Sequence, residues 1–101
     1  MRLQAIQHLV AAGQYRYSQK VRTLIEEGWF EEADLEACIC SATRIHKRVR
    51  DEFRQSRDTL KYVILGRDTY GRSFYTAGKI FTGAQGQIYF FITAHQADSP
   101  P

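Results

Sequence analysis

Residues 60–95 read LKYVILGRDTYGRSFYTAGKIFTGAQGQIYFFITAH, and this stretch decides the fold class. It contains three runs rich in Val, Ile, Tyr and Phe, which predict strands because β-branched and aromatic side chains suit a pleated, half-buried surface. The runs cover 60–65, 72–81 and 87–95. Glycine-containing turns at 66–72 and 82–86 separate them, and connections this short join antiparallel strands rather than parallel ones.

A fourth strand is predicted directly upstream, over residues 44–50. Basic or imidazole side chains alternate there with Ile45, Lys47 and Val49, and this period of two places one set on a single face. The basic set is Arg44, His46, Arg48 and Arg50. Residues 51–59 are too polar for a core and are expected to form a loop.

The N-terminal half predicts helices over about 3–12, 18–27 and 31–41. Apolar residues recur there at spacings of three and four, Ser18 is a good N-cap, and Gly13 and Gly28 are stop signals. Helices followed by consecutive strands indicate an α+β protein, with the N-terminal helices packed on one face of a four-stranded antiparallel sheet. We expect one domain over residues 1–96 and a flexible C-terminal tail over 97–101.

Composition limits the classes of function. The 101 residues carry a net charge of +3, and no apolar stretch approaches the length of a membrane span. The N-terminus has no signal-peptide pattern, so we expect a cytoplasmic protein without membrane association. Cys38 and Cys40 are expected to be reduced thiols of the core, and neither a metal nor another cofactor is expected.

Charge is unevenly distributed along the chain. Residues 26–36 are acidic without a basic residue, whereas residues 44–61 are rich in Arg and Lys. A basic cluster of this kind is the electrostatic footprint of a nucleic-acid binder, although it also occurs as an ordinary solvated face.

A series of short motifs indicates a family. In chain order they are Tyr17-Ser18-Gln19-Lys20, Glu26-Glu27, Asp34-Leu35-Glu36, Lys61-Tyr62, Gly66-Arg67-Asp68, Gly71-Arg72 and Phe91-Ile92-Thr93-Ala94-His95. Together, over residues 15–96, they resemble domain-of-unknown-function family 4258. Lys20 stands where that family typically has a His. The resemblance implies kinship with the RelE-like and BrnT-like ribonuclease toxins of toxin–antitoxin modules, a RelE-like topology, RNA as substrate and an antitoxin protein as partner.

Metal-independent RNA cleavage needs a base for the 2′-OH, cations for the phosphate and an acid for the leaving 5′-oxygen. The candidates for catalysis are His95, His46 and Arg48. His95 is expected on one strand face together with Tyr89, Phe91 and Thr93. The candidates for nucleic-acid binding are Arg44, Arg50, Lys61, Arg72, Lys79, Lys20 and Tyr70. The leading hypothesis is therefore a toxin-like endoribonuclease.

Two other hypotheses remain open from the sequence. The same basic face could belong to a binding module without catalysis, which would hold nucleic acid or an acidic protein. Alternatively, the acidic helix 31–41 and the neighbouring Trp29-Phe30 could form the interface of a structural adaptor.

Overall fold

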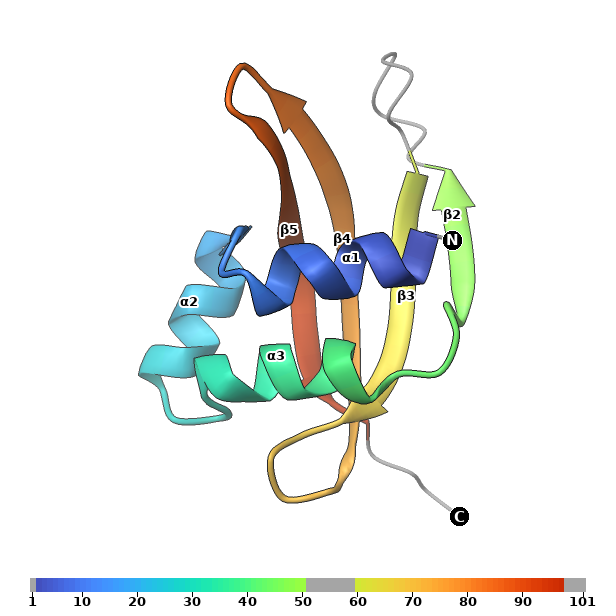
Figure 1. The fold of residues 1–101 in the computed structure, drawn as a ribbon. Coiled ribbons are helices and arrows are strands. Elements are labelled where there is room, and N and C mark those ends of the chain that lie inside the picture. Colours follow the sequence, from blue (N-terminus) through green and yellow to red (C-terminus); the bar gives the residue numbers. More distant parts are fainter. Residues whose placement is uncertain (1, 51–59, 98–101) are drawn as a thin grey trace.

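The computed structural model describes residues 2–50 and 60–97, and Figure 1 shows their arrangement. Within these ranges the helices are α1 (Arg2–Ala11), α2 (Gln19–Glu26) and α3 (Glu32–Ser41). The strands are β1 (Tyr15–Tyr17), β2 (Lys47–Arg50), β3 (Leu60–Arg67), β4 (Ser73–Gly83) and β5 (Gly86–Gln96). The loop expected over 51–59 and the tail from 98 to 101 lie outside the described residues, and Ala97 donates its N–H to Ser73 O at 3.0 Å.

The sheet has five strands in the order β1-β5-β4-β3-β2 and is mixed. β2 to β5 form the predicted antiparallel series, but β1 pairs in parallel with β5, with Tyr15 opposite Tyr89. The prediction of four antiparallel strands was therefore wrong by one strand. Three residues are too few to give an alternating pattern, and the partner of β1 lies near the other end of the chain.

α1 and α3 pack across one face of the sheet, as predicted, whereas α2 lies beside β5 at the edge of the sheet (Figure 1). Cys38 of α3 lies over the sheet centre, with its Sγ 3.5 Å from Phe74 O and 3.8 Å from Thr76 Oγ1. Gln7 of α1 donates to Ile39 O of α3 at 3.0 Å. Fully buried side chains of both layers form the core: Ile6, Val10, Val21, Leu35, Cys38, Ile39, Ile64, Phe74, Thr76, Tyr89 and Phe91.

The basic strand is shorter than predicted, because β2 begins at Lys47 rather than at residue 44. His46 lies just before it and donates its backbone N–H to Val63 O at 2.9 Å. Arg48 pairs with Tyr62, a core residue, so its side chain lies on the same side of the sheet as the helices. Arg50, two residues on, lies on that side as well, and both side chains are exposed.

A β-bulge in β5 changes which residues share a face. Ala77 pairs with Thr93, but the next residue of β4, Gly78, pairs with Phe91, so Ile92 is an additional residue in β5. Tyr89 and Phe91 consequently point into the core, whereas Thr93 and His95 lie on the opposite side. The prediction that these four side chains share one face was wrong, because the additional residue of the bulge interrupts the alternation of faces along β5.

Candidate nucleic-acid interface

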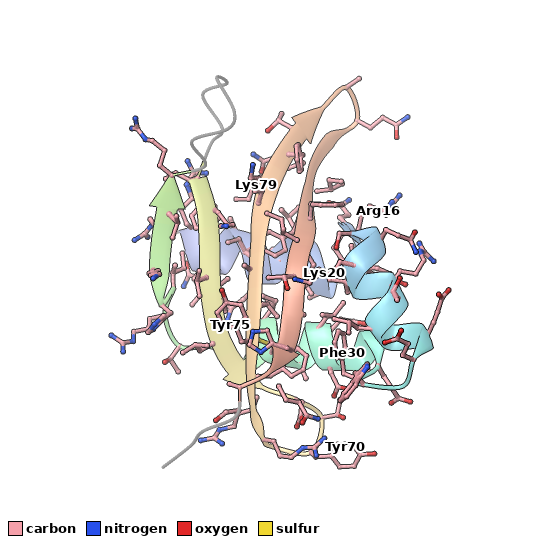
Figure 2. The ribbon with its side chains drawn as sticks, turned by 180° about the vertical axis from the view of Figure 1, so that it is seen from behind. Arg16, Lys20, Phe30, Tyr70, Tyr75 and Lys79 are labelled. Carbon is pink, nitrogen blue, oxygen red and sulfur yellow. The ribbon has the colours of Figure 1, made fainter. Side chains whose placement is uncertain are left out.

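The face of the sheet opposite the helices gathers cations and rings, and we call it the helix-free face (Figure 2). Pairing register places its residues, since directly paired residues lie on the same side of a sheet. They include Arg16 of β1; Phe90, Thr93 and His95 of β5; Tyr75, Ala77 and Lys79 of β4; Lys61, Val63, Leu65 and Arg67 of β3; and Lys47 and Val49 of β2.

Three cationic residues form a row across this face. Arg16 is paired with Phe90, and Phe90 is paired with Lys79 on its other side. Lys61 lies on the same side of β3, one residue beyond the last pair of the β3–β4 ladder, which is Tyr62 with Gly78. Neighbouring strands are about 4.8 Å apart, so the row places positive charge on both sides of an aromatic ring. Arg16 is exposed, Lys61 is half-buried and Lys79 is buried.

His95 and Tyr75 form a stacked cross-strand pair on the same face. Their ring centroids are 4.5 Å apart and the planes meet at 17°. The Nδ1 atom of His95 lies 2.9 Å from its neighbour's carbonyl, Gln96 O. A carbonyl oxygen only accepts, so this contact assigns the proton of the neutral ring to Nδ1. Nε2 then carries the lone pair, which is the form that a general base needs.

Lys20, near the start of α2, lies beside β5. Tyr75 and Lys79 are four residues apart in β4, which corresponds to about 13 Å. Figure 2 shows Lys20 beside β5 at a height between them. Ser18 anchors the start of α2 to β5, because its Oγ donates to Ile92 O at 2.8 Å and accepts the N–H of Val21 at 3.2 Å as the N-cap of α2.

The three predicted catalytic residues do not come together. His95 lies on β5, whereas His46 precedes β2 and Arg48 lies within it, and two strands separate β2 from β5. Arg48 also lies on the opposite side of the sheet from His95. Arg44 precedes His46 in the chain and Arg50 follows Arg48; both are exposed, at the β2 edge of the sheet.

Arg72 and Tyr70 belong to the loop between β3 and β4, at one end of the sheet (Figure 2). Asp68 organises this loop: its Oδ1 accepts the N–H groups of Tyr70 and Arg72, each at 2.9 Å, and its Oδ2 is 3.0 Å from Arg72 Nε. The Arg72 guanidinium also lies 5.1 Å from the centre of the Tyr70 ring. The charge of Arg72 therefore has a structural partner, while Tyr70 is 77% exposed at the tip.

Sequence reasoning missed Arg16, Lys47 and Phe90 as parts of this face. Arg16 gave no signal because β1 was not recognised, and Lys47 was assigned to the apolar face of its strand. Phe90 lies between Tyr89 and Phe91 in the chain, and both of those are core residues. Because successive strand residues point to opposite faces, Phe90 must point away from the core.

The acidic segment has partners inside the protein. Tyr15 Oη lies 2.6 Å from Glu32 Oε2 and 3.0 Å from Glu36 Oε2, and Tyr17 Oη donates to Glu32 Oε1 at 3.1 Å. Burial, followed by these carboxylates, raises the pKa of Tyr15. Two acidic residues of α3 thus hold β1 in place.

The two thiols occupy different environments. Cys38 is fully buried, and burial raises the pKa of its thiol to about 11. Cys40 is exposed, so the prediction of a core position was correct for the first cysteine and wrong for the second. Residues 2–50 and 60–97 contain no cluster of three His, Cys, Asp or Glu side chains that could hold a metal ion. No helix among those residues has the length and apolar character needed to span a membrane.

Comparisons of the chain with protein-family models, curated proteins and solved structures found no match. The function therefore has to be argued from the geometry of the helix-free face.

Proposed function

We propose that this protein is a metal-independent endoribonuclease that holds single-stranded RNA on the helix-free face. The observation that carries the proposal is His95, an imidazole with its proton assigned to Nδ1, stacked on Tyr75 on a sheet face that also bears cations. Kinship with the RelE-like and BrnT-like ribonuclease toxins, which the resemblance to family 4258 implies, is part of this proposal. A RelE-like topology, a cytoplasmic location and a cognate antitoxin protein are parts of the same proposal.

The proposed reaction uses the nucleophile that RNA itself provides. His95 Nε2 takes the proton of a 2′-OH, and the 2′-oxygen attacks the adjacent phosphorus. The bond from 2′-oxygen to phosphorus forms as the bond from phosphorus to the 5′-oxygen breaks, and the leaving oxygen takes a proton from solvent. The products are a 2′,3′-cyclic phosphate and a 5′-OH. Lys20, beside β5, is the cation assigned to the phosphate on which charge develops.

Binding is assigned to the cationic row and to the rings beside it. Arg16 and Lys61 contact phosphates, and Phe90 and Tyr75 give stacking surfaces for bases. Phosphate contacts and stacking on aromatic rings do not depend strongly on base sequence, so the face can hold single-stranded RNA of many sequences. DNA binds to the same face in this proposal but is not cut, because it has no 2′-OH.

Cleavage should be tested with purified protein and a 5′-labelled single-stranded RNA in excess EDTA. We expect fragments that end in a cyclic phosphate and no cleavage of DNA of the same sequence. His95→Gln should lose cleavage by about 100-fold or more while it keeps RNA affinity, since general-base catalysis contributes about 10²- to 10⁴-fold. His8→Gln, at an exposed position of α1, is the matched control and should cut normally.

The outcomes separate the hypotheses that the sequence left open. RNA that binds but stays intact would contradict the nuclease and leave a binding module. Cleavage that persists in His95→Gln would contradict the assigned base. Absence of both binding and cleavage would remove RNA from the proposal altogether.

A further inference from the structure

A surface pocket adjoins His95 on the side away from the cationic row. It has a volume of about 310 Å³ and lies between the α2–α3 connection and the end of β5. Its lining residues are Leu24, Trp29, Phe30, His95 and Gln96. Three of these five side chains are aromatic rings, one is an amide and none is acidic.

The backbone at the end of α2 fixes the position of Trp29. Gly28 has φ +86°, a conformation that side chains with a Cβ rarely adopt. Its N–H donates to Ile25 O at 3.0 Å, and the N–H of Trp29 donates to Leu24 O at 3.0 Å. These two bonds form a Schellman motif, which commonly brings the residue after the glycine against the residue that accepts its bond. Trp29 and Leu24 indeed line the same pocket.

The aromatic walls are held before any ligand arrives. Trp29 Nε1 donates to Glu27 Oε1 at 3.0 Å, which orients the indole, yet the side chain stays 66% exposed. Phe30 is buried and packs edge-to-face on Phe74, with ring centroids 5.2 Å apart. An indole this exposed beside an anchored ring offers a rigid stacking surface and loses little entropy on binding.

We propose that this pocket binds one unstacked nucleobase of the RNA. The inference rests on the proposed function, and it adds a base-reading subsite next to the reacting phosphate. Trp29 stacks on the base, as aromatic side chains do in single-strand recognition. The Gln96 amide has both donors and an acceptor for the base edge. His95 is shared with the helix-free face, so a base in the pocket places its own backbone beside the proposed catalytic imidazole.

Charge around the pocket favours a base rather than a phosphate as occupant. Glu26 and Glu27 end α2, and Glu31 and Glu32 begin the next helix after the Trp29-Phe30 pair. The Glu27 carboxylate, which accepts the bond from the Trp29 indole at 3.0 Å, repels an RNA phosphate at this pocket but does not repel a neutral base. The phosphates then remain over the cationic side chains of the helix-free face.

Trp29 is the single tryptophan of the chain, so its fluorescence reports the pocket directly. The probe is a short 2′-O-methyl RNA, which blocks the 2′-oxygen and cannot be cut. We expect it to quench Trp29, with the same midpoint as the anisotropy of a fluorescein-labelled copy. An abasic oligonucleotide of equal length should bind through its phosphates and leave Trp29 fluorescence unchanged.

Variants test the same contact by affinity. Trp29→Ala should weaken binding of the base-containing probe by about 5- to 150-fold, the range found for loss of one base–aromatic stack, and should leave the abasic probe unaffected. Trp29→Phe keeps a ring and should retain most of the affinity. Gln96→Ala should change the order of affinity among homopolymer probes. Circular dichroism and urea unfolding check that each variant is folded.

Two failures are distinguishable. If the wild type binds RNA but saturation leaves Trp29 unquenched, or if Trp29→Ala binds at full affinity, the nucleobase pocket is wrong while RNA binding by the helix-free face stands. If the wild type binds neither probe by anisotropy, both the pocket and the proposed function are wrong.

Discussion

Single carboxylates hold the loops that surround the proposed site. Asp34, buried at the start of α3, accepts the N–H of Thr69 at 2.9 Å and its hydroxyl at 2.8 Å through Oδ1. Its Oδ2 accepts the N–H of Glu31 at 2.8 Å, which completes a capping box. One side chain thus joins the β3–β4 loop to the connection that carries Trp29 and Phe30.

Asp34→Ala is expected to lower the free energy of unfolding by about 2–3 kcal/mol, because three donors lose a charged acceptor. The measurement is urea unfolding at neutral pH, with the m-value unchanged. Glu26→Gln, at an exposed position of α2, is the control and should stay within about 0.5 kcal/mol of wild type. Equal stability of the two variants would contradict the structural role of Asp34.

Acid should remove the same contribution in wild type. Burial raises the pKa of Asp34, but the hydrogen bonds from Glu31 and Thr69 outweigh it and hold the pKa below its ordinary value of 3.8. A carboxyl with a lowered folded-state pKa stabilises the protein above its unfolded-state pKa, and this is lost as pH falls through the folded value. Stability should therefore fall below about pH 4, and more steeply in wild type than in Asp34→Ala. Parallel pH profiles would contradict this.

The two cysteines should differ in reactivity towards a thiol reagent such as DTNB. Burial raises the pKa of Cys38 to about 11, so its thiol is both inaccessible and protonated at neutral pH. We expect one fast-reacting thiol per native chain and a second after denaturation in urea. Cys40→Ser should lose the fast reaction. Two equally fast thiols in the native protein would mean that Cys38 is not buried in solution.

At the scale of elements, α2 depends on a contact that the sequence shows only in part. Ser18 was predicted to be an N-cap and is one, but its donation to Ile92 O could not be predicted because it reaches the far end of the chain. The additional residue at Ile92 creates the bulge that turns Thr93 and His95 to the helix-free face. The N-cap of α2 at Ser18 and the bulge of β5 at Ile92 are therefore in contact beside the proposed site.

Ser18→Ala is expected to destabilise the protein by about 1–2 kcal/mol, since it removes both the cap of α2 and the bond to β5. Thermal and urea unfolding measure the loss. Because Lys20 lies two residues further on, RNA affinity should also fall in this variant. Ser73→Ala, at an exposed strand start, is the matched control and should change neither quantity. A fully stable Ser18→Ala would show that the anchor to β5 contributes nothing.

An element could be predicted from the sequence when the interactions that form it join residues close together in the chain. The helices and the hairpin strands were predicted within a few residues, because their periodicity and their glycine turns are local signals. β1 was missed because Tyr15, Arg16 and Tyr17 form a strand only through pairing with β5. The site followed the same rule: His95, Lys61, Lys79 and Lys20 were named from the sequence, but only the bulge in β5 shows that His95 lies on the same side of the sheet as Lys61 and Lys79.

At the scale of the whole molecule, acidic and basic residues lie on different parts of the surface. The acidic residues gather on α2, α3 and their connection, and part of this charge is engaged by Tyr15 and Tyr17. The helix-free face carries the cationic row instead. This polarity orients a polyanion so that its backbone crosses the open sheet, whereas only an uncharged part of it approaches the Trp29 pocket.

Two arginines of the sheet on opposite faces allow this orientation to be tested with matched substitutions. Arg16 lies in the cationic row, and Arg48 lies on the side of the helices; both are exposed. Each phosphate contact to a single strand contributes about 0.7 to the slope of log affinity against log salt concentration. Arg16→Gln should therefore weaken binding of the 2′-O-methyl RNA at low salt and reduce the slope by about 0.7. Arg48→Gln removes the same charge from the chain and should leave the slope unchanged. If the two variants lose affinity and slope equally, RNA responds only to the net charge of +3, and the helix-free face has no special role.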